Sequence, residues 1–113
     1  MLEPEIFEEI IRRILGVTSP RRIILFGSAA AGRMTRDSDI DLLVLEEKPD
    51  NPRQESVRLR RALRGLGFPI DVIVMTTDRF EETKDIIGGI AFPAYKYGKV
   101  IYFGDLAGPV TTG

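Results

Sequence analysis

Apolar residues follow two periodicities along the chain. Helical spacing covers residues 3–15 and 53–66, and a third helical pattern begins at Asp78 and runs through Ile87. Four short apolar runs rich in β-branched residues, at 22–26, 39–45, 69–75 and 99–103, are typical of strands. Glycine or proline punctuates the connections, and Ala29 to Ala31 suggest one or two further helical turns. The pattern therefore predicts helices that alternate with strands.

This alternation predicts an α/β (α+β) fold, in which helices flank a small mixed β-sheet of about four strands. We expect the run at 22–26 to be buried on both faces and the run at 99–103 to form an edge strand. The 113 residues suffice for one domain but not for two ordinary ones. We assign residues 1–104 to that domain and residues 105–113 to a flexible C-terminal tail.

The composition excludes several kinds of chemistry. The chain has no histidine and no cysteine, so a histidine base, a thiolate or histidine metal site and a disulfide are impossible. Catalysis has to come from carboxylates, hydroxyls, lysine, arginine, backbone amides or a hard cation bound by oxygen. The net charge is −1, and no apolar run approaches the length of a membrane span. We expect a cytoplasmic protein with no membrane contact and no direct nucleic-acid binding.

Asp39 and Asp41 begin the strand predicted at 39–45. Alternate residues of a strand project to the same face, so these two carboxylates should lie roughly 6.6–7 Å apart along it. Such a pair repels itself unless a cation sits between its members, and oxygen ligands favour magnesium, manganese or calcium. An EF-hand loop starting at Asp37 is excluded, because Leu42 and Lys48 occupy the positions that require glycine and glutamate.

Two further features extend this candidate site. Asp71 lies near the start of the otherwise apolar strand at 69–75, and it joins the other two aspartates if that strand is a neighbour of 39–45. Gly27 and Ser28 follow a buried strand at the start of a short helix, where backbone amides and a hydroxyl can bind phosphate. The segment is neither a Walker A loop nor a dinucleotide-binding GxGxxG motif.

Gly27-Ser28, ten intervening residues and Asp39-Ile40-Asp41 form a G-S-x10-D-x-D pattern (GSx10DxD) with a strand on each side. From the first helix to Phe103, the chain closely resembles the minimal nucleotidyltransferases of the DNA polymerase β-like nucleotidyltransferase superfamily. The resemblance implies that Asp39 and Asp41 bind one or two Mg²⁺ ions. It also implies that Asp71 completes the metal site and helps to deprotonate an acceptor hydroxyl, while Gly27 and Ser28 hold the triphosphate of ATP.

The chain departs from the family pattern inside the ten-residue gap. Minimal members commonly carry arginines where this sequence has Ala29 and Ala31. We expect Arg33 or Arg36 to neutralise phosphate charge instead. The arginines of the segment 53–66 are interpreted as a solvated helix face (Arg53, Arg58, Arg60, Arg61 and Arg64).

Minimal members resemble antitoxins that adenylylate a tyrosine of a HEPN ribonuclease toxin. The function implied by the resemblance is therefore Mg²⁺-dependent transfer of AMP from ATP to a tyrosine of a HEPN-domain partner. Two alternatives remain open. The chain could be a non-catalytic antitoxin that neutralises its partner by binding, or a homodimeric nucleotidyltransferase that modifies a small molecule such as an antibiotic.

Overall fold

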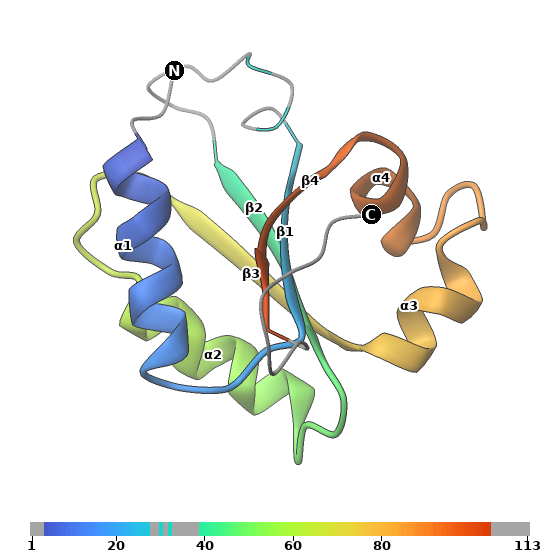
Figure 1. The fold of residues 1–113 in the computed structure, drawn as a ribbon, viewed down its shortest axis with the longest axis horizontal. Helices are drawn as coiled ribbons and strands as arrows, with labels where there is room; N and C mark the ends of the chain where they lie inside the picture. Colours follow the sequence, from blue (N-terminus) through green and yellow to red (C-terminus); the bar gives the residue numbers. More distant parts are fainter. Residues whose placement is uncertain (1–3, 28–29, 31, 33–38, 105–113) are drawn as a thin grey trace.

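The computed structural model describes residues 4–27, 30, 32 and 39–104 of the chain. Within them, four strands form one mixed sheet in the order β3-β2-β1-β4 (Figure 1). This confirms the predicted fold class and the edge position of the last strand. In chain order the elements are α1 (Pro4–Leu15), β1 (Arg22–Phe26), β2 (Ile40–Glu46), α2 (Pro52–Ala62), β3 (Ile70–Thr76), α3 (Thr77–Thr83), α4 (Ala91–Tyr97) and β4 (Lys99–Phe103).

The direction of the strands follows from their connections. β1 is antiparallel to both of its neighbours, β2 and β4. β2 and β3 are parallel, and α2 forms the crossover between them, as a parallel pair requires. The first residues of β2 and β3 therefore lie at the same end of the sheet, which is the end where Asp39, Asp41 and Asp71 occur.

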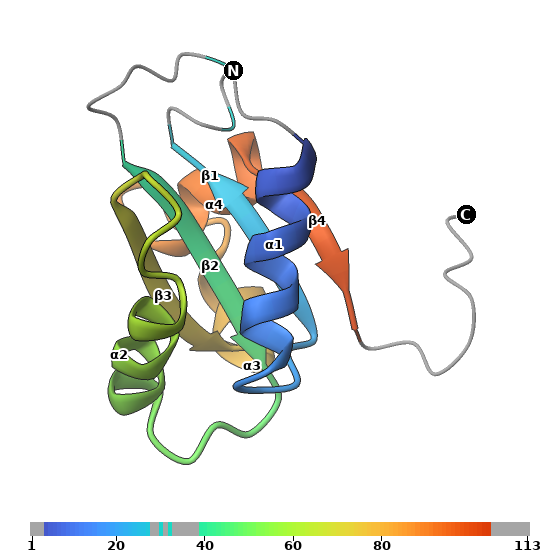
Figure 2. The same ribbon diagram turned by 90° about the vertical axis from the view of Figure 1, so that its left-hand side faces the viewer.

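Helices cover both faces of the sheet, with α1 and α2 on one side and α3 and α4 on the other (Figures 1 and 2). Alternate strand residues contribute to the two cores, which explains why the central residues of β1 (23–25) and β2 (42–45) are all apolar rather than alternating with polar ones. The core beneath α1 and α2 contains Ile10, Ile14, Ile23, Leu25, Ile40, Leu42, Val44, Leu59, Leu63, Val72 and Val74. The core beneath α3 and α4 contains Ile24, Leu43, Leu45, Met75, Phe80, Ala91 and Ala94.

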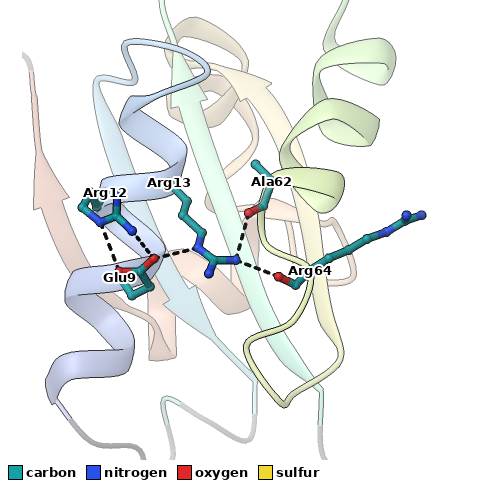
Figure 3. Close-up of polar contacts among 5 residues, drawn as sticks. All are labelled: Glu9, Arg12, Arg13, Ala62 and Arg64. Carbon is teal, nitrogen blue, oxygen red and sulfur yellow. Dashed lines mark hydrogen bonds and ion pairs between the residues drawn. The ribbon is translucent and has the colours of Figure 1, made fainter.

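A polar contact fixes α1 against the end of α2 (Figure 3). The guanidinium of Arg13 donates hydrogen bonds through Nη1 to the carbonyl oxygens of Ala62, at 3.2 Å, and Arg64, at 2.7 Å. Its Nε donates to Glu9 at 2.8 Å. Carbonyls at the end of a helix lack intrahelical partners, so Arg13 satisfies groups that would otherwise need water.

Two helix ends differ from the prediction. The helix predicted through Ile87 is wrong at its end: α3 stops at Thr83, and the separate helix α4 starts at Ala91. Gly88, with φ of +92°, lies in the turn between them, and Pro93 is tolerated because it falls in the first turn of α4. α2 likewise ends at Ala62 rather than at residue 66.

Some predictions concern parts of the chain that the structure leaves undescribed. The helical turn expected at Ala29 to Ala31 has only its middle residue among the described ones, and the tail at 105–113 has none. The domain boundary at 104 therefore stays a prediction. Among the helices that are described, none is long and apolar enough to cross a membrane.

Candidate active site at the start of β2 and β3

The parallel register between β2 and β3 sets Asp41 directly opposite Asp71. Each aspartate is the second residue of its strand, and alternation places both on the sheet face covered by α3 and α4. Asp39 immediately precedes β2 and is exposed. The condition under which Asp71 joins the other carboxylates, that its strand lies beside β2, is met in this sheet.

Gly27 makes room for the carboxylate of Asp41. A Cβ atom added at Gly27 would lie 2.3 Å from Oδ2 of Asp41, which is far inside van der Waals contact. Gly27 also has φ of +76°, a backbone conformation that side-chain-bearing residues rarely adopt. The glycine of the G-S motif therefore has a steric role that is visible in the structure: it lets β1 end directly against the acidic group of β2.

The electrostatics of Asp41 reflect its crowded position. Partial burial raises the pKa of the Asp41 carboxyl, and the nearby carboxylates of Asp71 and Asp39 raise it further. All three effects disfavour the ionised form of Asp41. A bound divalent cation would reverse this preference, because it supplies positive charge where three acidic groups influence one another.

The donor set at this end of the sheet fits Mg²⁺. In the described part of the chain, no group of three or more acidic, histidine or cysteine side chains is arranged to hold a metal ion. Mg²⁺ does not require one, because it is usually bound by one or two carboxylates together with substrate phosphates and water. Asp41 and Asp71, facing each other across neighbouring strands, supply two such carboxylates.

The candidate site is also contacted by Arg60, a side chain that the sequence analysis placed on a solvated helix face. Nη2 of Arg60, on α2, lies 2.9 Å from Oδ1 of Asp71, and both side chains are about half exposed. The same nitrogen donates a weak hydrogen bond to the carbonyl oxygen of Val72 at 3.4 Å. In the sequence, the position of Arg60 directly after the core residue Leu59 indicates that it lies near the buried side of its helix. That position predicts the contact with Asp71 only if it is known that β3 lies beside α2.

Beside Arg60, a groove of about 320 Å³ runs between α2 and β3. Its lining residues are Pro52, Arg53, Ser56, Val57, Arg60, Val72, Ile73 and Val74. Because Arg60 both lines this groove and contacts Asp71, one end of the groove adjoins the candidate site.

The predicted phosphate-binding residues are described only in part. Gly27 lies among the described residues, whereas Ser28, Arg33 and Arg36 lie outside them. The contribution of these three residues to triphosphate binding therefore stays a prediction.

Comparison with known proteins identifies a family and two similar solved structures. The family profile described as a nucleotidyltransferase domain matches residues 5–94. A crystal structure of a toxin–antitoxin with AMP-PNP is 21% identical, with a TM-score of 0.54, and the match covers 86% of this chain and 73% of that one. A provisionally assigned nucleotidyltransferase from Sulfolobus solfataricus is 20% identical, with a TM-score of 0.59 and coverage of 88% and 78%. No curated protein matches the sequence.

Proposed function

The chain belongs to the nucleotidyltransferase domain family, and from this premise we propose that it transfers AMP from ATP to a hydroxyl group of a partner protein in a Mg²⁺-dependent reaction. The observation that carries the proposal is the register that sets Asp41 opposite Asp71 beside Gly27. Two acidic groups at a glycine-lined strand end are suited to a metal–triphosphate substrate, because the cation would offset the negative charge of both the carboxylates and the triphosphate.

The proposed roles follow from the positions of the side chains. Asp41 and Asp71, assisted by Asp39, would hold one or two Mg²⁺ ions, which offset negative charge on the triphosphate when bound. Asp71 accepts the proton of the acceptor hydroxyl. The hydroxyl oxygen then forms a bond to the α-phosphorus, the bond between the α-phosphorus and the bridging oxygen breaks, and pyrophosphate leaves.

The triphosphate itself needs donors beyond the carboxylates. We assign this task to the backbone at Gly27, the hydroxyl of Ser28 and the guanidinium groups of Arg33 and Arg36. Guanidinium groups and free backbone amides commonly bind phosphate.

Two observations favour a protein as the acceptor. The chain is similar in fold to a protein solved as a toxin–antitoxin with AMP-PNP. In addition, the connection between α3 and α4 exposes large apolar side chains, with Ile87 84% exposed and Ile86 and Ile90 more than half exposed. Such surfaces are commonly covered by a partner. We propose a tyrosine of a HEPN-domain toxin as the acceptor, which makes this chain its antitoxin.

A second function is favoured by one feature of the sequence. Ala29 and Ala31 stand where minimal nucleotidyltransferases commonly carry arginines, so triphosphate affinity could be too low for turnover. In that case the chain would act as an antitoxin by binding alone.

The test is transfer of label from α-³²P-ATP to a purified HEPN partner in the presence of Mg²⁺. We expect the wild-type protein to label the partner and Asp41→Asn to abolish labelling, since the substitution removes a carboxylate from the site. Asp78→Asn, which changes an exposed aspartate of α3, is the matched control and should leave labelling unchanged. Tight binding without label supports the non-catalytic function. Undiminished labelling by Asp41→Asn contradicts the assignment of the site.

A further inference from the structure

Arg60 occupies a distinctive place among the ion pairs of the described residues. Those pairs involve Glu9, Glu47, Glu81 and Asp71, so the Arg60–Asp71 pair alone includes one of the three candidate carboxylates. Among the described residues, the positively charged group paired with Asp71 is therefore the guanidinium of Arg60, at 2.9 Å.

The fold determines where this guanidinium lies. Leu59 and Leu63 are buried beneath α2, so the neighbouring Arg60 emerges at the flank of the helix that faces β3. β3 is the outermost strand on this side of the sheet. Two residues of α2 reach its main chain: Arg60 donates to the carbonyl of Val72, and the hydroxyl of Ser56 accepts from the amide of Val74 at 3.3 Å. Arg60 thus has two acceptors on β3, which hold it beside Asp71.

We propose that Arg60 is a positioning residue that competes with the divalent cation for Asp71. Asp71 lies on the sheet face opposite α2, and Arg60 reaches it past the outer edge of β3. Without a bound cation, the guanidinium occupies Oδ1 of Asp71 and holds this carboxylate at that edge. When the cation binds, Asp71 exchanges one positively charged partner for another. The inference depends on the proposed function in one respect only, the assignment of Asp71 as a metal ligand.

The strength of the ion pair sets the size of the effect. Both side chains are about half exposed, and exposed ion pairs are weak because water and salt screen them. Arg60 is therefore displaceable, as a ligand exchange requires. Removing it should tighten cation binding by about two- to five-fold, since the cation no longer has to break the pair.

The experiment measures Mn²⁺ binding to the full chain without nucleotide, through loss of the electron paramagnetic resonance signal of free aqueous Mn²⁺. We expect Arg60→Met to bind Mn²⁺ about two- to five-fold more tightly than wild type. Arg61→Met is the matched control, because it removes the same charge from an exposed position of the same helix. Arg60→Lys, which keeps the charge but loses the planar fork, should fall between wild type and Arg60→Met.

A double-mutant cycle separates the contact from the general charge effect. In an Asp71→Asn background, Arg60→Met should no longer change Mn²⁺ affinity, because the carboxylate for which it competes is gone. Equal changes in Mn²⁺ affinity for Arg60→Met and Arg61→Met would overturn the inference. Weaker Mn²⁺ binding by Arg60→Met than by wild type would also overturn it, as would the absence of Mn²⁺ binding in both proteins. If the affinity shift is present but no AMP is transferred, the inference stands and the proposed enzymatic function fails. Thermal melting of each variant verifies that it is folded.

Discussion

Glu46, the last residue of β2, and Glu55, in the first turn of α2, form a buried acidic pair. The two residues are only 6% and 7% exposed, and one carboxyl oxygen of each finds no hydrogen-bond partner in the described part of the chain. Burial, followed by a hydrogen bond to Glu55 and its charge, raises the pKa of Glu46 to about 7. The hydroxyl of Thr18 and the charge of Arg58 act in the opposite direction but do not cancel the increase. Below neutral pH, the pair therefore carries a proton on Glu46.

A pKa that is raised in the folded state makes stability depend on pH with a definite sign. The contribution of Glu46 is fully present below about pH 4.5, decreases as the pH rises, and is lost once the pH passes about 7. At about 1.4 kcal/mol per pH unit, the displacement from 4.5 to about 7 corresponds to about 3 kcal/mol. This is a large fraction of the free energy of unfolding of a small domain.

Glu46→Gln replaces the carboxyl by a neutral amide of nearly the same shape, which can donate a hydrogen bond to Glu55. We expect this variant to exceed wild type in free energy of unfolding by about 3 kcal/mol near pH 8.5, and by less than about 1 kcal/mol near pH 5. The measurement is urea denaturation followed by circular dichroism at both pH values. Glu47→Gln is the matched control, because that neighbouring side chain is 59% exposed and pairs with Arg21 at the surface. If Glu46→Gln retains the pH dependence of wild type, the assignment of this dependence to Glu46 is incorrect.

Two further substitutions test contacts that define the fold and the site. Gly65→Ala should destabilise the protein by about 1–2 kcal/mol, because this glycine has a positive φ. Gly27→Ala should destabilise it by more, because Gly27 also has a positive φ and its new Cβ would overlap Asp41. Gly27→Ala should also weaken Mn²⁺ binding, and equal stability losses for the two variants in urea denaturation would contradict the steric role of Gly27. Arg13→Met should destabilise the protein by about 1–2 kcal/mol, since two carbonyls near the end of α2 lose their donor. The side chain of Arg12 is 72% exposed and bonds to Glu9, so Arg12→Met should change stability by less than about 1 kcal/mol in the same assay.

The strands were the part of the fold that the sequence predicted best. The bounds of β1 and β4 agree with the prediction, and β2 and β3 are displaced by one residue, because short β-branched runs between turn residues leave little freedom. The ends of the helices were less predictable. Leu63 and Leu66 continue the apolar pattern of α2 and pack on the core, yet they lie beyond the helix. Apolar periodicity reports burial, and burial does not require a helix.

The site was predictable to different extents for different residues. That Asp39 and Asp41 share a face is a prediction from strand alternation alone, whereas the place of Asp71 depends on strand order, which no local pattern reveals. The contact of Arg60 with Asp71 was not anticipated. An arginine on an exposed helix face has the same sequence pattern whether it faces water or a carboxylate on a neighbouring strand, so tertiary packing decides its role.

β2 contributes one member to an acidic pair near each of its ends, and the two pairs lie in different surroundings. Near its end, Glu46 faces Glu55 on the side of α1 and α2, where water is excluded and a proton neutralises the pair. Near its start, Asp41 faces Asp71 on the opposite side of the sheet, where Asp71 is half exposed and has Arg60 as its counter-ion. A buried acidic pair is neutralised by a proton, because a larger cation would have to lose its water. An exposed carboxylate can exchange one cationic partner for another from solution. Under the proposed function, the start of β2 is therefore the end at which a cation and its nucleotide would enter and leave.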